Sequence, residues 1–271
     1  MRLGLVLRNM GQTATAQGLG QLAEAAEAAK LDSIWVTDHV AIPPDDAEGS
    51  DGIYYDPLAT LAYLAARTRT IHLGTAVLIA PYRPALPTAK WVATIQSLSE
   101  GRLELGIGVG WMRSEFTALG VDRHRRGQLT DELLAFLHRC FAEDVVVAND
   151  QPFLFRPCPP RPPILIGGSA PHALKRTAAF AEAWLPIRAT PASIASEREH
   201  LAAFAAEAGR LTPEIHPMGP IPLDGNAGRD HIAAFAAAGA SRLIHTARYD
   251  SLTEGLKVIE QLAHLRADTP S

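Results

Sequence analysis

The chain has few cysteines and lacks any long apolar run. Only Cys140 and Cys158 occur among its 271 residues, too few for a disulfide framework, and neither stands in a spacing typical of zinc ligands. No apolar stretch is long enough to span a bilayer, and the segment after Met1 has neither the basic nor the apolar region of a signal peptide. We therefore expect a cytoplasmic protein in which both cysteines are bystanders.

A strong excess of charge is absent too. The 25 basic and 29 acidic side chains give a formal net charge of −4, and the isoelectric point lies near 6.2. Such a balance offers no overall attraction to phosphate backbones or anionic lipid, so we expect small-molecule partners and neither nucleic acid nor membrane. No pair of histidines stands at metal-ligand spacing with a carboxylate partner, which predicts no metal site. A Gly-x-Ser-x-Gly elbow and a P-loop are also missing, which excludes the enzyme classes that depend on them.

The chain does contain a regular alternation of short apolar strands and longer helical patterns, which is typical of a parallel sheet covered by helices. We expect strands near residues 2–7, 33–37, 71–77, 103–108, 164–167, 183–185, 214–219 and 242–246. We expect helices near residues 17–30, 57–67, 85–99, 126–142, 171–180, 191–208, 230–238 and 252–266. Eight such units predict an α/β fold, the TIM (β/α)8 barrel, with residues 1–271 forming a single domain.

Two polar residues follow the second expected strand. Asp38 and His39 come directly after the strand near residues 33–37, and the working residues of such barrels lie at the carboxyl ends of the strands. A histidine there can donate or accept a proton near neutral pH, with a neighbouring carboxylate to tune it. The pair therefore predicts an acid/base group at the barrel mouth. The alternative is a surface pair that only caps a turn.

A glycine-rich strand follows the third helix. From Leu103 onward, apolar residues alternate with a second set on the opposite face, namely Glu104, Gly106, Gly108 and Gly110. We expect the apolar face to pack against helices and the glycine face to look into the barrel, leaving room for a planar ring. The alternative is a glycine strand whose neighbouring space is filled by large residues from opposite strands.

A second glycine turn follows the strand near residues 164–167. Gly167, Gly168 and Ser169 precede Pro171, a favoured residue in the first helical turn, so backbone amides there could bind a phosphate group. Plain turn chemistry would require the same residues.

The helix near residues 85–99 carries more apolar surface than one contact with the barrel uses. A second face holds Trp91, Ile95 and Leu98. The preceding helix adds Leu58, Leu61, Tyr63 and Leu64. We interpret the two helices as a homodimer surface, with mutual coverage of adjacent helices as the alternative.

The motifs taken together resemble the luciferase-like flavin and deazaflavin oxidoreductases, the bacterial luciferase superfamily, over nearly the whole chain. They are Asp38–His39, Leu73–Val77, Pro81–Pro84, Lys90, Leu98–Arg102, Gly106–Trp111, Glu115–Phe116, Leu119–Gly120, Pro162–Ile164 and Gly167–Ser169.

The resemblance implies a barrel that binds FMN or the deazaflavin coenzyme F420 at its carboxyl-terminal mouth, usually in a homodimer. It places a non-prolyl cis peptide at Ala76–Val77, beside the ring. It also implies that Thr75, Gly108 and Gly110 lie near the ring, that His39 lies beside ring and substrate, and that Gly167, Gly168 and Ser169 meet the cofactor phosphate.

Residues Gly106–Trp111 with Glu115–Phe116 resemble the deazaflavin-dependent branch more than the flavin monooxygenases. The resemblance thus implies hydride transfer between C5 of F420 and a small organic substrate, with His39 moving a proton and Asp38 holding its orientation. Two alternatives stay open: an FMN-dependent two-component monooxygenase, and a protein that binds flavin or deazaflavin without turnover. A flavin or F420 reductase would be a partner. The hairpin that usually precedes the proline-rich connector is expected to be compressed around residues 152–156.

Overall fold

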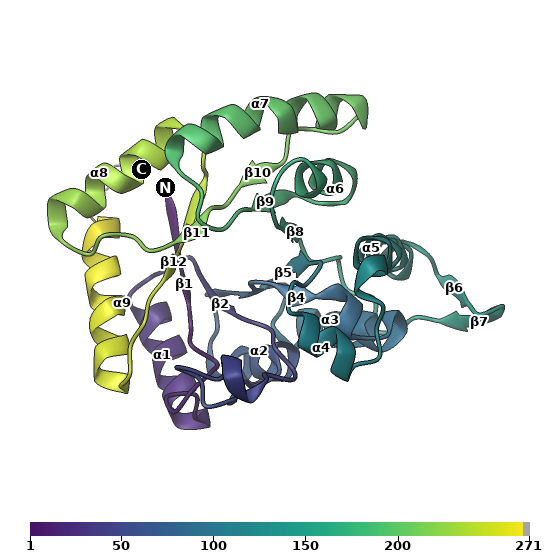
Figure 1. Ribbon diagram of the computed structural model, residues 1–271, viewed down its shortest axis with the longest axis horizontal. Helices are drawn as coiled ribbons and strands as arrows, with labels where there is room; N and C mark the ends of the chain where they lie inside the picture. Colours follow the sequence, from purple (N-terminus) through teal and green to yellow (C-terminus); the bar gives the residue numbers. More distant parts are fainter. Residues whose placement is uncertain (268–271) are drawn as a thin grey trace.

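The computed structural model describes residues 1–267, and a curled parallel sheet forms its centre (Figure 1). The strands, in chain order, are β1 (Arg2–Val6), β2 (Ser33–Val36), β3 (His72–Thr75), β4 (Leu78–Ile79), β5 (Leu103–Gly108), β8 (Ile164–Gly167), β9 (Ala183–Leu185), β10 (Glu214–Ile215), β11 (Met218–Gly219) and β12 (Arg242–Thr246). Each strand that was expected is present. The expected strand near 71–77 is interrupted after Thr75, and β4 continues it along β5.

The short run 214–219 closes the sheet into a barrel. Its first part, β10, pairs with β9 through Glu214 and Ala183, and its second part, β11, pairs with β12 through Met218 and Ile244. The two outer strands of the remaining sheet are thereby joined by one segment. The predicted (β/α)8 barrel is confirmed, with eight strand positions within residues 1–267.

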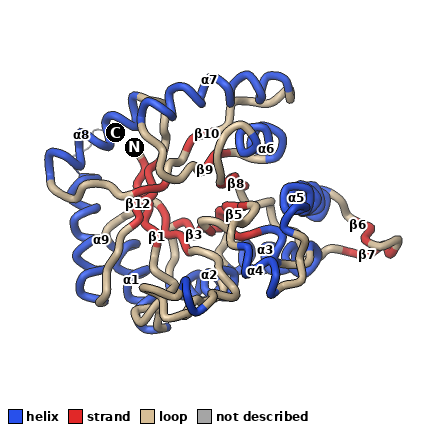
Figure 2. Tube along the Cα trace, viewed as in Figure 1, coloured by secondary structure: helices blue, strands red, loops and turns tan. Residues whose placement is uncertain are grey.

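Helices alternate with the strands and cover the outside of the sheet (Figure 2). They are α1 (Ala16–Ala28), α2 (Pro57–Arg67), α3 (Ala85–Leu98), α5 (Arg126–Ala142), α6 (His172–Phe180), α7 (Pro191–Glu207), α8 (Gly225–Ala237) and α9 (Leu252–Ala267). Side chains of Thr15, Asp56 and Thr190 accept hydrogen bonds from amides of the first turns of α1, α2 and α7, groups that the helix itself leaves unpaired.

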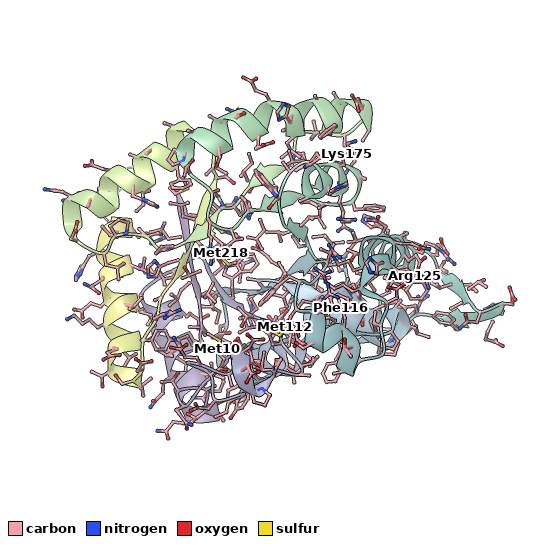
Figure 3. All side chains as sticks on the ribbon, viewed as in Figure 1. Met10, Met112, Phe116, Arg125, Lys175 and Met218 are labelled. Atoms are coloured by element: carbon pink, nitrogen blue, oxygen red, sulfur yellow. The ribbon has the colours of Figure 1, made fainter. Side chains whose placement is uncertain are left out.

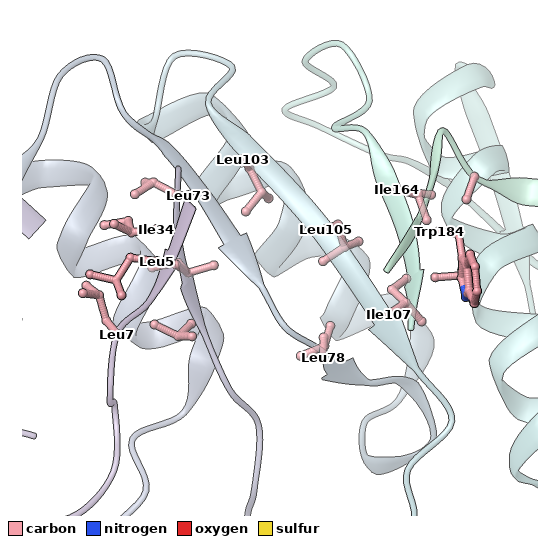
Figure 4. Packing of buried hydrophobic residues seen from close by; sticks show 14 of the residues in the cluster. Leu5, Leu7, Ile34, Leu73, Leu78, Leu103, Leu105, Ile107, Ile164 and Trp184 are labelled. Atoms are coloured by element: carbon pink, nitrogen blue, oxygen red, sulfur yellow. The ribbon is translucent and has the colours of Figure 1, made fainter. Parts of the chain in front are cut away.

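The main core lies between the sheet and these helices. Apolar residues of alternate strand positions, among them Leu73, Leu103, Leu105 and Ile107, point outward into this layer (Figure 4). The outward direction predicted for the apolar residues of β5 is therefore confirmed. The other face of β5 looks into the barrel, where burial on both sides of the sheet favours small or well-paired residues.

Short elements in the loops were not predicted. They are α4 (Arg113–Ala118) and the 3₁₀ turns η1 (Pro44–Asp46), η2 (Ala80–Tyr82) and η3 (Arg123–Arg125). The hairpin of β6 (Val145–Ala148) and β7 (Gln151–Leu154) extends away from the barrel in Figure 1. Its two strands pair along four residues, and Asn149 and Asp150 take the positive φ of a tight turn. The compression around 152–156 relative to similar proteins stays a prediction.

The apolar face predicted for a homodimer is mostly used inside the molecule. Ile95 of α3 and Leu58, Leu61 and Leu64 of α2 are fully or nearly fully buried in the core, so their assignment to an external face is wrong. Trp91 and Leu98 remain exposed, by 48% and 62%. The dimer itself stays a prediction. Across residues 1–267, no helix combines the length and the apolar character needed to cross a membrane.

Candidate functional site

A cavity of about 780 Å³ opens at the carboxyl ends of the strands. Asp38 and His39 line it from the loop after β2, and Ala76 and Val77 line it from the break between β3 and β4. The predicted residues Gly108, Gly110, Gly167 and Gly168 line it as well, whereas Thr75 and Ser169 are not among the lining residues. Figure 3 labels two further lining residues, Met10 in the loop after β1 and Met218 in β11. The volume suits a bound organic molecule of substantial size.

The Ala76–Val77 peptide bond is cis, as the resemblance implied. A Cβ on Gly108 would lie 2.4 Å from Cγ2 of Val77, and a Cβ on Gly167 would lie 2.7 Å from Cγ1. The Val77 side chain therefore occupies the space between these two glycines. Gly106 is equally tight, since a Cβ there would lie 2.0 Å from the carbonyl oxygen of Thr75.

The role predicted for the glycine face needs a correction. Gly106 and Gly108 make room for the interrupted strand β3–β4, and that strand then presents Val77 to the cavity. The space beside Gly110 is likewise filled, because a Cβ there would meet Ile79 and Phe116. Thr75 is fully buried and its hydroxyl donates to the Gly106 carbonyl at 2.7 Å, so it fastens β3 to β5 behind the cavity wall.

His39 is held by a buried glutamate. Its Nδ1 lies 2.9 Å from Oε2 of Glu115, a side chain with no solvent exposure that also accepts a hydrogen bond from the Tyr82 hydroxyl. The backbone amides of Val40 and Ala41 donate to the other oxygen at 2.6 and 3.1 Å. Burial raises the pKa of Glu115, but the hydrogen bonds from His39, the two amides and Tyr82 lower it to about 2. Glu115 is thus an ionised acceptor near neutral pH.

This arrangement fixes which nitrogen of His39 can react. An ionised carboxylate only accepts hydrogen bonds, so Nδ1 must carry the hydrogen that it shares with Glu115. Nε2 is then the atom left to take up or release a proton on the cavity side. Tyr54 and Trp111 stand edge-on to the imidazole, with ring centroids at 4.9 and 6.1 Å. A histidine fixed in one tautomer beside a cavity is suited to general acid–base chemistry.

Asp38 does not orient His39, so that prediction is wrong. Its two oxygens form a bidentate pair with Arg83 at 2.6 and 2.9 Å, and the amide of Ile79 donates to Oδ2 at 2.8 Å. Burial raises the pKa of Asp38, and Arg83 opposes that rise. Side chains of adjacent residues in an extended segment point to opposite sides, which separates Asp38 from His39. Asp38 instead ties the end of β2 to β4.

The glycine turn after β8 is held by a hydrogen bond from β9. Gly168 adopts a φ of 124°, open only to glycine, and its carbonyl accepts a hydrogen bond from the Trp184 indole at 2.9 Å. Ser169 is exposed, and helix α6 begins three residues later. Phosphate binding at Gly167, Gly168 and Ser169 stays a prediction. Among the described residues, no group of three or more histidine, cysteine or acidic side chains could hold a metal ion.

Sequence reasoning missed Glu115 as the partner of His39. Glu115 stands on the unexpected helix α4, 76 positions after His39, and Phe116 next to it packs edge-on against Tyr82. The residue occurs in a motif that carried the family resemblance, but nothing in its spacing indicates which side chain it contacts.

Sequence comparison with known proteins identifies a family and several relatives. The profile of the family described as luciferase-like monooxygenase matches residues 1–264. An uncharacterised protein of Mycobacterium tuberculosis strain H37Rv is 30% identical over 223 residues, which cover 75% of this chain and 76% of that protein.

Solved structures share the fold at low identity. An F420-dependent secondary alcohol dehydrogenase in complex with an F420-acetone adduct superposes with a TM-score of 0.81 at 16% identity, covering 98% of this chain and 99% of that one. The oxygenating constituent of a diketocamphane monooxygenase from Pseudomonas putida, in complex with FMN, superposes with a TM-score of 0.78 at 14% identity over 97% of both chains.

Proposed function

Because this chain belongs to the luciferase-like monooxygenase family, we propose that it is an F420-dependent oxidoreductase that transfers a hydride between deazaflavin C5 and a small organic substrate. The observation that carries this proposal is the His39–Glu115 pair at the cavity. Interconverting an alcohol and a carbonyl by hydride transfer requires one proton at the substrate oxygen, and a histidine with a free Nε2 supplies or removes it.

The residues present fit a flat cofactor. The cavity is large enough for a fused ring together with a small substrate, Ala76 and Val77 offer an apolar support, and the turn at Gly167 and Gly168 exposes backbone toward the cavity. The deazaflavin, when bound, supplies the carbon that accepts or gives the hydride.

The chain's own residues would act on the substrate as follows. Nε2 of His39 takes the proton from the substrate hydroxyl, or returns it to a carbonyl oxygen in the reverse direction. Glu115 stabilises the imidazolium that forms, since its carboxylate is buried and ionised. Tyr54 and Trp111 pack edge-on against the imidazole and restrict it to one orientation.

An FMN-dependent two-component monooxygenase is the second candidate. The neighbour in complex with FMN has the same fold as this chain, which supports it. The two candidates differ in cofactor preference and in the need for oxygen and a separate reductase.

One experiment separates them. Purified protein is titrated with F420 and with FMN by fluorescence, and turnover is followed as F420 reduction with a panel of small secondary alcohols. We expect tighter binding of F420, and His39→Ala should lower turnover by about 10² to 10⁴ while leaving cofactor affinity largely intact. His200→Ala is the matched control, because His200 is an exposed residue of α7 paired with Glu197.

Tighter FMN binding would overturn the choice of cofactor. Unchanged turnover in His39→Ala would reject the proton-transfer role. Binding of neither cofactor would reject the function as a whole.

A further inference from the structure

Arg8 is a buried cation without an acidic partner. It follows β1, lines the cavity and is only 9% exposed. Its Nη2 donates to the Gly49 carbonyl at 3.0 Å, and its guanidinium stands 5.9 Å from the centre of the Tyr249 ring. Its Nε is buried with no hydrogen-bond partner. Within residues 1–267 no carboxylate forms an ion pair with Arg8.

The carboxylates around the cavity have other partners: Arg83 pairs with both Asp38 and Asp56, and the ionised Glu115 accepts from His39. None of these three carboxylates pairs with Arg8. A second lining cation, Arg248, follows β12 and is exposed. A buried guanidinium without a counter-ion is a costly arrangement, and a bound oxyanion relieves that cost. The cavity wall at Arg8 and Arg248 is therefore suited to a negatively charged group.

The order of strands in the barrel places Arg8 and Arg248 far from the glycine turn after β8. β12 is the direct neighbour of β1, so Arg8 and Arg248 follow adjacent strands. From β1, the strand β8 is the fourth position in either direction around the closed sheet. The two arginines thus stand across the mouth from Gly167 and Gly168, where a cofactor phosphate is predicted.

We propose that Arg8, assisted by Arg248, binds a carboxylate or similar oxyanion carried by the substrate, so that the substrate class is an organic anion. This proposal rests on the proposed function for identifying the cavity as the substrate site. Arg8 follows β1 and His39 follows β2, the strand that pairs with β1, so an anion at Arg8 lies on the same side of the cavity as the proton-transferring histidine.

The test compares phenylacetate with phenylacetamide, which share a shape and differ in charge. Isothermal titration calorimetry is carried out on the full chain without cofactor and after loading with F420 or FMN. We expect phenylacetate to bind more tightly than the amide, and Arg8→Met to reduce that preference by roughly tenfold to a hundredfold. Arg8→Lys should retain part of it.

Arg139→Gln is the control for charge alone, because Arg139 is a half-exposed residue of α5 whose partner is Glu143. It should leave the preference unchanged. Thermal unfolding of each variant establishes that the protein is folded before binding is interpreted.

A third arm identifies the source of the anion. F420 is compared with the same deazaflavin lacking its phosphate and glutamate tail. If Arg8→Met weakens F420 binding alone and leaves the preference for phenylacetate unchanged, Arg8 holds the cofactor tail and the proposal is overturned. Equal binding of phenylacetate and phenylacetamide to the wild type also overturns it. The preference for phenylacetate over phenylacetamide is also measured without cofactor, so this result does not depend on which cofactor the protein binds.

Discussion

The two ends of the barrel each bury a glutamate beside a histidine, yet they serve different purposes. At the amino end, Glu104 contacts His72 at 3.1 Å and forms a bidentate pair with Arg242. Arg242 in turn lies over the Trp35 ring at 5.7 Å. At the carboxyl end, Glu115 holds His39 and no arginine, and His39 faces a cavity.

The two sites differ in the main partner of the glutamate, which is an arginine at the amino end and a histidine at the carboxyl end. Burial raises the pKa of both glutamates, and hydrogen bonds lower each to about 2, so both carboxylates are ionised near neutral pH. At the amino end the charge is neutralised by a fixed cation and the space is filled, since a Cβ on Gly74 would lie 2.1 Å from Trp35. At the carboxyl end the partner is a group that can change its own charge. Each charge of a fixed buried pair depends on its partner, whereas a titratable pair beside a cavity can do chemistry.

The largest effect is expected at the amino end. Arg242→Met leaves Glu104 buried without its main counter-ion, so the free energy of unfolding should fall by about 3–5 kcal/mol. Cofactor affinity per folded molecule should not change. Denaturant unfolding and fluorescence titration measure the two quantities. The double variant Glu104→Leu with Arg242→Met should regain much of the loss, because it leaves no unpaired charge.

Arg156→Met is the matched control, since Arg156 and Asp144 form a pair on the surface whose side chains are 53% and 93% exposed. It should cost about 0–1 kcal/mol. A loss of similar size in both variants would contradict a special role for the barrel interior.

At the carboxyl end, Glu115→Gln should lower turnover by about tenfold to a hundredfold. Glutamine keeps the shape but removes the charge that stabilises the imidazolium. The charge-retaining variant Glu115→Asp provides the decisive reading, because it should keep more turnover than Glu115→Gln. Glu197→Gln alters the exposed pair with His200 and should leave turnover unchanged. An equal loss in Glu115→Asp and Glu115→Gln would indicate a structural role alone.

The smallest effect is expected at Gly108, the last residue of β5, which lines the cavity. Gly108→Ala places a methyl group 2.4 Å from Val77, which can shift only toward the cavity that it lines. We expect a loss of about 1 kcal/mol in unfolding free energy and weaker cofactor binding, measured by denaturant unfolding and titration. Adding Val77→Ala should restore the free energy of unfolding. If the double variant is no more stable than Gly108→Ala, Val77 is not the side chain that the glycine accommodates.

Much of the fold could be predicted because its signals are local. Apolar periodicity gave the strands and helices, and the alternation in β5 gave its outward and inward faces. Closure by the run 214–219 follows from the strand count, although the split of that run into β10 and β11 does not.

The site was harder to predict, because its contacts join distant segments. Asp38 and His39 are neighbours in sequence but turn to different partners, Arg83 and Glu115. The open face of β5 was recognised, but its occupant is Val77 from the strand beside it. The lack of a counter-ion for Arg8 becomes visible only when every surrounding loop is in place.

The position of Glu115 has a consequence for how such a barrel can diversify. The carboxylate stands on α4, a six-residue helix in the loop after β5, whereas Glu104 and Arg242 belong to the strands. Exchange of that one loop would replace the partner of the histidine and leave the ion pair of the amino end in place. The ion pair inside the barrel and the partner of the histidine are thus carried by separable stretches of the same polypeptide.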